Sequence, residues 1–127
     1  MSVYAMDISG SMWNSVDEIL DDMRQRVAMD DTIILFTDIL HIHRNPAVFL
    51  QDPQMPNMGS AEMKIVYDWM AANAAGETLF VYSDGGMMER HRRQDEGRTI
   101  VLVTSTPVAE RVEEVFPGAR VVYRGDW

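Results

Sequence analysis

The chain contains no cysteine. It therefore has no disulfide bond, no thiolate nucleophile and no thiolate zinc site, and it is compatible with a reducing compartment. The residues before Asp7 include no basic segment and no apolar stretch long enough for a signal peptide or a membrane span. We therefore expect a cytoplasmic protein that does not enter a membrane.

Basic residues are scarce, with 11 Lys and Arg against 20 Asp and Glu, which gives a formal net charge of -9. This balance argues against a nucleic-acid-binding surface, since binding to phosphates depends on clustered Lys and Arg. A basic or cationic partner suits the chain better. We interpret the acidic pairs as solvated positions on a helix and at its end, without chemistry of their own: Asp17-Glu18, Asp21-Asp22 and Asp30-Asp31.

Short apolar segments recur along the whole chain, and most are rich in β-branched residues. Their length and composition predict buried strands at residues 3–6, 32–36, 78–82, 99–103 and 120–123. With 127 residues and 46% hydrophobic content, the chain is long enough for one buried core. We therefore expect a single domain over residues 1–127.

Apolar residues spaced by three and four predict amphipathic helices between these strands. The three stripes are Trp13, Val16, Leu20, Met23 and Val27; Met63, Val66, Tyr67, Met70 and Ala74; and Val108, Val112, Val115 and Phe116. Alternating strands and helices predict an α/β fold with a Rossmann-like, doubly wound and mostly parallel sheet. Residues 38–43 follow the second strand too closely for a helical crossover, so we expect an antiparallel edge strand there. Residues 85–97 are compatible with a short helix.

The first strand leads directly into the segment Asp7-Ile8-Ser9-Gly10-Ser11, just before a predicted helix. This segment offers one carboxylate and two hydroxyl oxygens around a glycine that permits a tight turn. Mg²⁺ prefers oxygen ligands and keeps several waters, so such a partial set of ligands suits it. The pattern alone has a second interpretation, in which Ser9 or Ser11 simply caps the helix.

The same segment resembles the Asp-x-Ser-x-Ser signature of von Willebrand factor A (VWA) domains, which begins their metal-ion-dependent adhesion site (MIDAS). Two later segments resemble the rest of that site: Gly59-Ser60 after a loop rich in proline, and Ser83-Asp84-Gly85 after the strand at 78–82. The order of strands and helices also matches over most of the chain. The resemblance implies that one Mg²⁺, with Mn²⁺ or Ca²⁺ as alternatives, is held by Asp7, Ser9, Ser11, Ser60 and Asp84.

The strands of a VWA sheet have the order 3-2-1-4-5-6, and the resemblance implies the same order here. Asp7 and Asp84 would then leave the carboxyl ends of adjacent strands, about 4.8 Å apart, where crevices form in open α/β sheets. Two carboxylates so close repel each other unless a cation lies between them. Ser60 stands where the family has threonine; the hydroxyl is retained, and direct binding of Ser60 to the cation is left open.

Other residues permit alternative interpretations. His41 and His43 share one face of the predicted edge strand, which permits a His-x-His metal site, although exposed polar residues are expected there anyway. Asp38 is either an acceptor for cation-bound water or a turn residue. The basic run 90–93 either guides an acidic partner or forms a solvated helix face. Three methionines beside the ligand segments are interpreted as an apolar rim around the cation: Met12, Met58 and Met87.

These residues favour a binding module rather than an enzyme. The resemblance implies that the cation keeps an open coordination position, which an Asp or Glu carboxylate of a partner protein fills. Stand-alone domains of this kind include adaptors for AAA+ ATPase assemblies. Two alternatives are a metal-dependent hydrolase that uses the same Asp7 and Asp84, and an interaction domain that needs no metal. The hydrolase would require a positioned general base or a second metal, and the sequence places no histidine near the three ligand segments.

Overall fold

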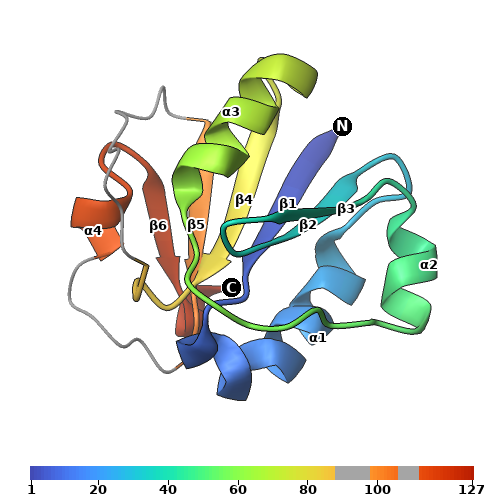
Figure 1. Ribbon diagram of the computed structural model, residues 1–127, viewed down its shortest axis with the longest axis horizontal. Helices are drawn as coiled ribbons and strands as arrows, with labels where there is room; N and C mark the ends of the chain where they lie inside the picture. The colour runs from blue at the N-terminus through green and yellow to red at the C-terminus, as the bar shows by residue number, and fades with distance from the viewer. Residues whose placement is uncertain (88–97, 106–111) are drawn as a thin grey trace.

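A six-stranded sheet forms the centre of the protein, in the order β3-β2-β1-β4-β5-β6 (Figure 1). The structure is a computed structural model that describes residues 1–87, 98–105 and 112–127. Neighbouring strands are parallel except for β2 and β3, which form an antiparallel hairpin. The strands are β1 (Ser2–Asp7), β2 (Thr32–Phe36), β3 (Leu40–His43), β4 (Thr78–Ser83), β5 (Thr99–Val103) and β6 (Arg120–Tyr123). The predicted α/β fold, its strand order and its antiparallel edge strand are therefore confirmed.

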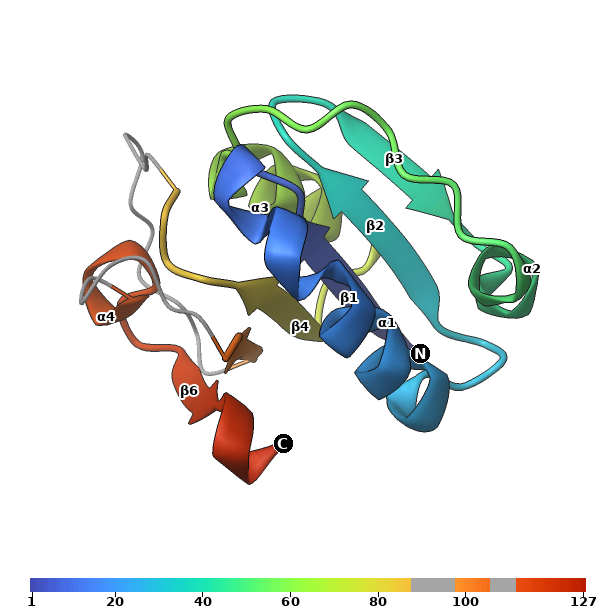
Figure 2. The same ribbon diagram turned by 90° about the horizontal axis from the view of Figure 1, so that it is seen from below.

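Helices cover both faces of the sheet, as the view in Figure 2 shows. They are α1 (Val16–Arg26), α2 (Pro46–Gln51), α3 (Met63–Asn73) and α4 (Val112–Val115), with short 3-10 helices η1 (Gly10–Ser15) and η2 (Arg124–Asp126). Side chains of a strand alternate between faces, so Tyr4 and Met6 of β1 pack with α1 and α2, while Val3 and Ala5 pack with α3 and α4. The core is thus divided into two layers by the sheet.

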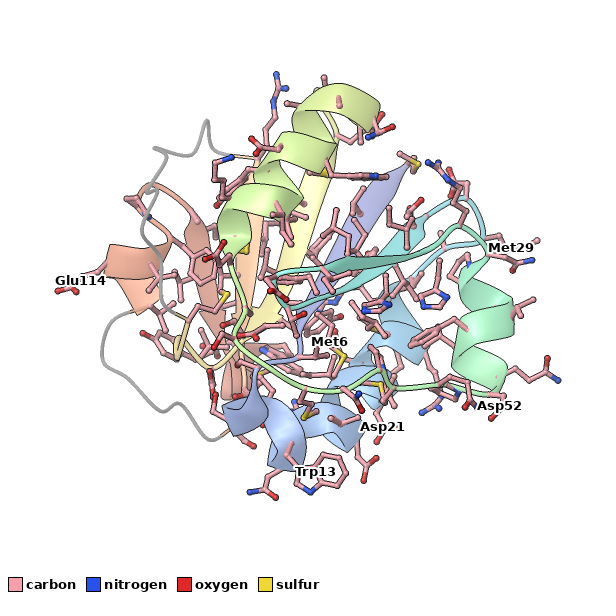
Figure 3. All side chains as sticks on the ribbon, viewed as in Figure 1. Met6, Trp13, Asp21, Met29, Asp52 and Glu114 are labelled. Carbon is pink, nitrogen blue, oxygen red and sulfur yellow. The ribbon has the colours of Figure 1, made fainter. Side chains whose placement is uncertain are left out.

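The first helix begins later than its apolar spacing predicts. Residues 10–15 form η1, and α1 begins at Val16 and buries Ile19, Leu20 and Met23. Trp13 is 71% exposed and points away from the body of the protein (Figure 3). A 3-10 helix has three residues per turn instead of 3.6, so it rotates Trp13 out of the buried stripe. The prediction that Trp13 packs against the sheet is wrong.

Two carboxylates hold α1 against the ends of β4 and β5. Glu18 accepts hydrogen bonds from the backbone N–H of Ser105 (3.1 Å), from its hydroxyl (3.0 Å) and from Arg124 Nε (3.0 Å). One turn further along α1, Asp22 accepts a hydrogen bond from the hydroxyl of the buried Tyr82 on β4. These bonds fix the start of α1 close to the carboxyl ends of the central strands.

Some sequence-based interpretations fall outside the described residues. They concern most of the suggested helix at 85–97, the basic run 90–93, and Val108 of the third stripe. The remaining members of that stripe, Val112, Val115 and Phe116, are buried as predicted. Across the described ranges, every helix is too short or too polar to cross a lipid bilayer.

Candidate functional site

The carboxyl ends of β1 and β4 bring two acidic residues and their neighbours together. In the parallel pairing of these strands Met6 lies opposite Tyr82, so Asp7 and Ser83 follow at the same level. The Ser83 hydroxyl donates to Asp7 Oδ2 over 2.9 Å, and both side chains are fully buried. Ser83 Oγ in turn accepts the backbone N–H of Gly85 (3.0 Å), whose φ of 81° turns the chain sharply after Asp84.

The segment after β1 folds back over Asp7. The backbone N–H of Ser9 donates to Asp7 Oδ1 (2.8 Å), and the hydroxyl oxygens of Ser9 and Ser11 lie 3.3 Å apart. The backbone N–H of Met12 donates to the Ser9 carbonyl (2.9 Å), which starts η1. The side chain of Ser9 is a further hydrogen-bond donor to Asp7. The oxygens of Ser9 and Ser11 are thus gathered on one side of the Asp7 loop.

Asp84 is 1% exposed, and one of its oxygens has no hydrogen-bond donor within the described ranges. Its Oδ1 accepts the backbone N–H of Gly86 (2.8 Å), whereas the buried Oδ2 has no partner among the described residues. A Cβ added to Gly86 would stand 3.0 Å from Asp84 Oδ1 and 3.1 Å from Ser11 Oγ, so these two oxygens border one small space. An unsatisfied buried polar atom costs about 1–3 kcal/mol, and more if it is charged.

Burial sets the electrostatics of the site. Loss of hydration raises the pKa of Asp7 from its usual 3.8 to about 6, and the charge of Asp84 adds to this rise. Hydrogen bonds from Ser9 and Ser83 act in the opposite direction, because they favour the carboxylate. The protein therefore holds a carboxylate in a place that disfavours its charge.

The donor set fits a small hard cation. Carboxylate and hydroxyl oxygens converge from two adjacent strand ends, and Gly86 leaves open the space that a side chain would fill. One carboxylate oxygen has no donor in the part of the chain that the structure describes. Residues 1–87, 98–105 and 112–127 contain no group of three or more His, Cys, Asp or Glu side chains placed to hold a metal. A cation here would therefore need the hydroxyls of Ser9 and Ser11 beside Asp7 and Asp84.

The connection from α2 to α3 brings Ser60 to the same end of the sheet, where it crosses the carboxyl ends of β1 and β2 (Figure 1). The N–H of Gly59 donates to the Ile8 carbonyl (3.3 Å), and the N–H of Glu62 donates to the Thr37 carbonyl (3.2 Å). Gly59 also pairs with Ser9 as an isolated parallel bridge. The side chain of Ser60 is exposed. Its backbone is therefore held beside the site, while its role as a ligand stays a prediction.

One secondary interpretation of the sequence is corrected, and for Asp38 one of the two alternatives is favoured. Met12 is fully buried, Met87 is 3% exposed, and the half-buried Met58 packs against the core, so the predicted apolar rim of these three methionines is wrong. The exposed apolar side chain next to the ligand segment is Trp13 instead. Asp38 is exposed and accepts a hydrogen bond from the Thr37 hydroxyl (3.2 Å), which is the arrangement of a hairpin turn residue.

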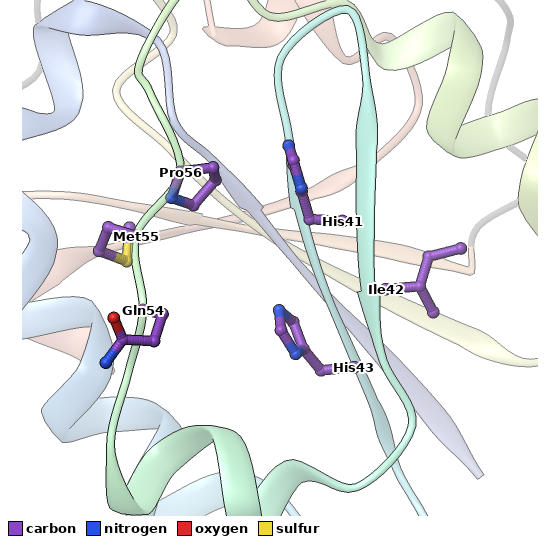
Figure 4. A pocket seen from close by; sticks show the side chains of 6 residues that line it. All are labelled: His41, Ile42, His43, Gln54, Met55 and Pro56. Atoms are coloured by element: carbon purple, nitrogen blue, oxygen red, sulfur yellow. The ribbon is translucent and has the colours of Figure 1, made fainter.

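His41 and His43 do lie on one face of β3, directed toward the loop that contains Met55 (Figure 4). With Ile42 between them they line a cavity of about 370 Å³, although the side chain of Ile42 points to the other side of the strand. The ring of His43 packs against Phe49, and the ring centroids are 4.4 Å apart. The pKa of His43 is lowered, mainly because the ring is partly buried and to a smaller extent because His41 carries charge of the same sign. This histidine is thus a packing residue of the edge strand.

Sequence reasoning missed the roles of Ser83 and Gly86. Ser83 was part of the recognised segment, but only the pairing of β1 with β4 shows that its hydroxyl binds Asp7. The second glycine of the pair at 85–86 was an available signal for a close approach, because a side chain there would meet Asp84 and Ser11. Comparison of the chain with protein-family models and with curated proteins finds no match.

Proposed function

We propose that this chain is a VWA-like domain that binds one divalent cation and, through it, an acidic side chain of a partner protein. The observation that carries this proposal is the buried Asp84 carboxylate: its Oδ1 borders the small space beside Ser11 and Gly86, and its Oδ2 has no donor among the described residues. The strand order supports it, because β1 and β4 are neighbours and their carboxyl ends lie at the topological switch point of the sheet.

Asp7, Ser9, Ser11 and Asp84 would hold the cation, and Ser60 is a further predicted ligand. Mg²⁺ suits these oxygens, with Mn²⁺ and Ca²⁺ as substitutes. A bound cation would supply a positive charge in a sheltered crevice, to which a carboxylate of the partner could bind. The hydroxyl ligands are neutral, so the site carries less negative charge than a cage built only of carboxylates. The bound cation would therefore keep more of its positive charge, and with it the ability to bind one more carboxylate.

The test uses Mg²⁺ and a blocked aspartate, N-acetyl-aspartate N-methylamide, followed by amide chemical shifts in a ¹H–¹⁵N NMR spectrum. We expect millimolar binding that shifts the amides of Ser9, Ser11 and Gly86 when Mg²⁺ is present. The asparagine analogue should have no effect, and EDTA should abolish binding. Asp84→Ala should lose both Mg²⁺ and peptide binding. Asp38→Asn is the matched control, because it removes an exposed charge at the same edge of the sheet and should bind normally.

Three results would contradict this function. Peptide-induced shifts that persist in EDTA would favour an interaction domain without metal. The same conclusion would follow if Mg²⁺ and Mn²⁺ left the melting temperature unchanged, since a ligand of the native state alone must stabilise it. Mg²⁺-dependent turnover of a phosphoester that is lost in Asp84→Asn would favour a hydrolase.

A further inference from the structure

Thr104 follows β5 and lies beside Asp84. Its backbone N–H donates to the Ser83 carbonyl (3.3 Å), which continues the pairing in which Ser83 lies opposite Val103. Thr104, just after β5, is therefore next to Asp84, just after the adjacent strand β4. Residues at the same level of adjacent parallel strands direct their side chains to the same face, with backbones about 4.8 Å apart.

The side chains of these two neighbours leave complementary atoms without partners. Asp84 Oδ2 is an acceptor, Thr104 Oγ1 can donate, and both are buried without a hydrogen-bond partner in the described part of the chain. Thr104 is 2% exposed, so bulk water does not satisfy its hydroxyl. Native proteins keep few such atoms, and each one calls for an explanation. Because the hydroxyl and the carboxylate are not bonded directly, a single polar group placed between them could satisfy both.

The backbone N–H of Thr104 and the donors of Ser105 already have hydrogen-bond partners. The N–H of Thr104 is bound to Ser83, and both donors of the next residue, Ser105, are bound to Glu18 on α1. The preceding Val103 is fully buried in the opposite layer of the core. The chain at residues 104–105 is thus held by these hydrogen bonds, whereas the buried Thr104 hydroxyl has no partner among the described residues. Valine would fill the same volume, so packing alone does not explain a threonine here.

We propose that Thr104 is a positioning residue of the cation site, which would then span β1, β4 and β5. Its hydroxyl holds a water of the cation's hydration shell against Asp84 Oδ2. Mg²⁺ keeps several of its waters when it binds to proteins, and partners that orient ligands in this way commonly change metal affinity by 10- to 100-fold. The inference rests on the proposed function, since it assigns one more residue to the same site.

The test compares Mg²⁺ binding by isothermal titration calorimetry in wild type, Thr104→Val and Thr104→Ser. We expect Thr104→Val to bind Mg²⁺ about 10-fold more weakly, and Thr104→Ser to restore wild-type affinity because it keeps the hydroxyl. Thr32→Val is the matched control. Thr32 is equally buried, but it begins β2 at the opposite end of the sheet, and its hydroxyl contacts the Met1 sulfur. Its replacement should leave Mg²⁺ affinity unchanged.

Unfolding of the cation-free proteins in urea separates positioning from a purely structural role. Thr104→Val should be at least as stable as wild type in EDTA, because a methyl group replaces an unpartnered hydroxyl. A marked loss of stability in EDTA, or wild-type Mg²⁺ affinity in Thr104→Val, would overturn the inference while leaving the proposed function intact. If wild type itself binds no Mg²⁺, the proposed function fails, and this inference fails with it.

Discussion

Replacing Asp7 by asparagine is expected to stabilise the cation-free protein and to remove its response to Mg²⁺. The amide oxygen can accept from Ser9 as the carboxylate does, and the amide nitrogen can donate to Ser83 Oγ, which reverses the direction of that hydrogen bond. Asparagine differs from aspartate mainly in having no charge. The variant therefore isolates the energetic effect of one buried negative charge.

The size of the effect follows from the pKa of Asp7. A pKa raised from 3.8 to about 6 means that the folded state binds this proton more tightly than the unfolded state does. The resulting stability is present below pH 3.8 and is lost as the pH rises through about 6. The difference corresponds to about 3 kcal/mol. In EDTA, Asp7→Asn should match wild type near pH 4 and exceed it by about 3 kcal/mol at pH 7.5, or roughly 10 °C in Tm.

The assay is urea unfolding and thermal melting at these two pH values, each in EDTA and in Mg²⁺. Wild type should gain about 2.7 kcal/mol when Mg²⁺ reaches 100 times its Kd, and Asp7→Asn should gain nothing. Asp31→Asn is the control, because Asp31 is also buried but accepts backbone N–H groups of Ser2 and Ala28 far from the site. The free energy of unfolding of Asp31→Asn should be about 1–2 kcal/mol lower than that of wild type, both in EDTA and in Mg²⁺. A variant Asp7→Asn that is less stable than wild type in EDTA at pH 7.5 would refute the reasoning.

Two further substitutions probe the space beside Asp84 and the anchoring of α1. Gly86→Ala should weaken Mg²⁺ binding at least 10-fold in calorimetry, because its Cβ would stand 3.0 Å from Asp84 Oδ1, whereas Gly10→Ala, with no atom within 4 Å of its Cβ, should bind normally. Equal affinity of the two variants would contradict this picture of the site. Tyr82→Phe removes the donor to Asp22 and should lower the free energy of unfolding by about 2 kcal/mol in urea, with Mg²⁺ affinity unchanged. A parallel loss of Mg²⁺ affinity would show that this hydrogen bond also supports the site.

Much of the fold was predictable because local patterns and topology agree. Short β-branched segments alternating with amphipathic stretches leave few arrangements other than a parallel sheet with crossover helices. The hairpin at β2 and β3 followed from a connection too short for a helix. Asp7 and Asp84 were recognised because their segments resemble the VWA signature. Asp7 ends β1 and Asp84 follows β4, and strand ends are the positions that a parallel sheet brings together.

The remaining features depend on information that no single segment contains. Trp13 has the spacing of a buried residue, but a 3-10 turn changes its direction. The burial of Met12 and Met87 depends on how the loops pack over the sheet. Ser83 and Thr104 acquire their significance from the registers of β4 with β1 and with β5, which a sequence specifies only through the whole fold.

Glu18 makes α1 and the exit of β5 a mechanically linked pair. Its carboxylate accepts hydrogen bonds from Ser105, the residue after Thr104, and from Arg124 at the start of η2. A displacement of α1 along its axis would therefore shift the segment that follows β5, and a rearrangement of that segment would act back on the helix. Such reciprocity is what thermodynamic linkage requires of any two coupled locations. A partner that binds the outer surface of α1 would thus also act on the position of the segment after β5.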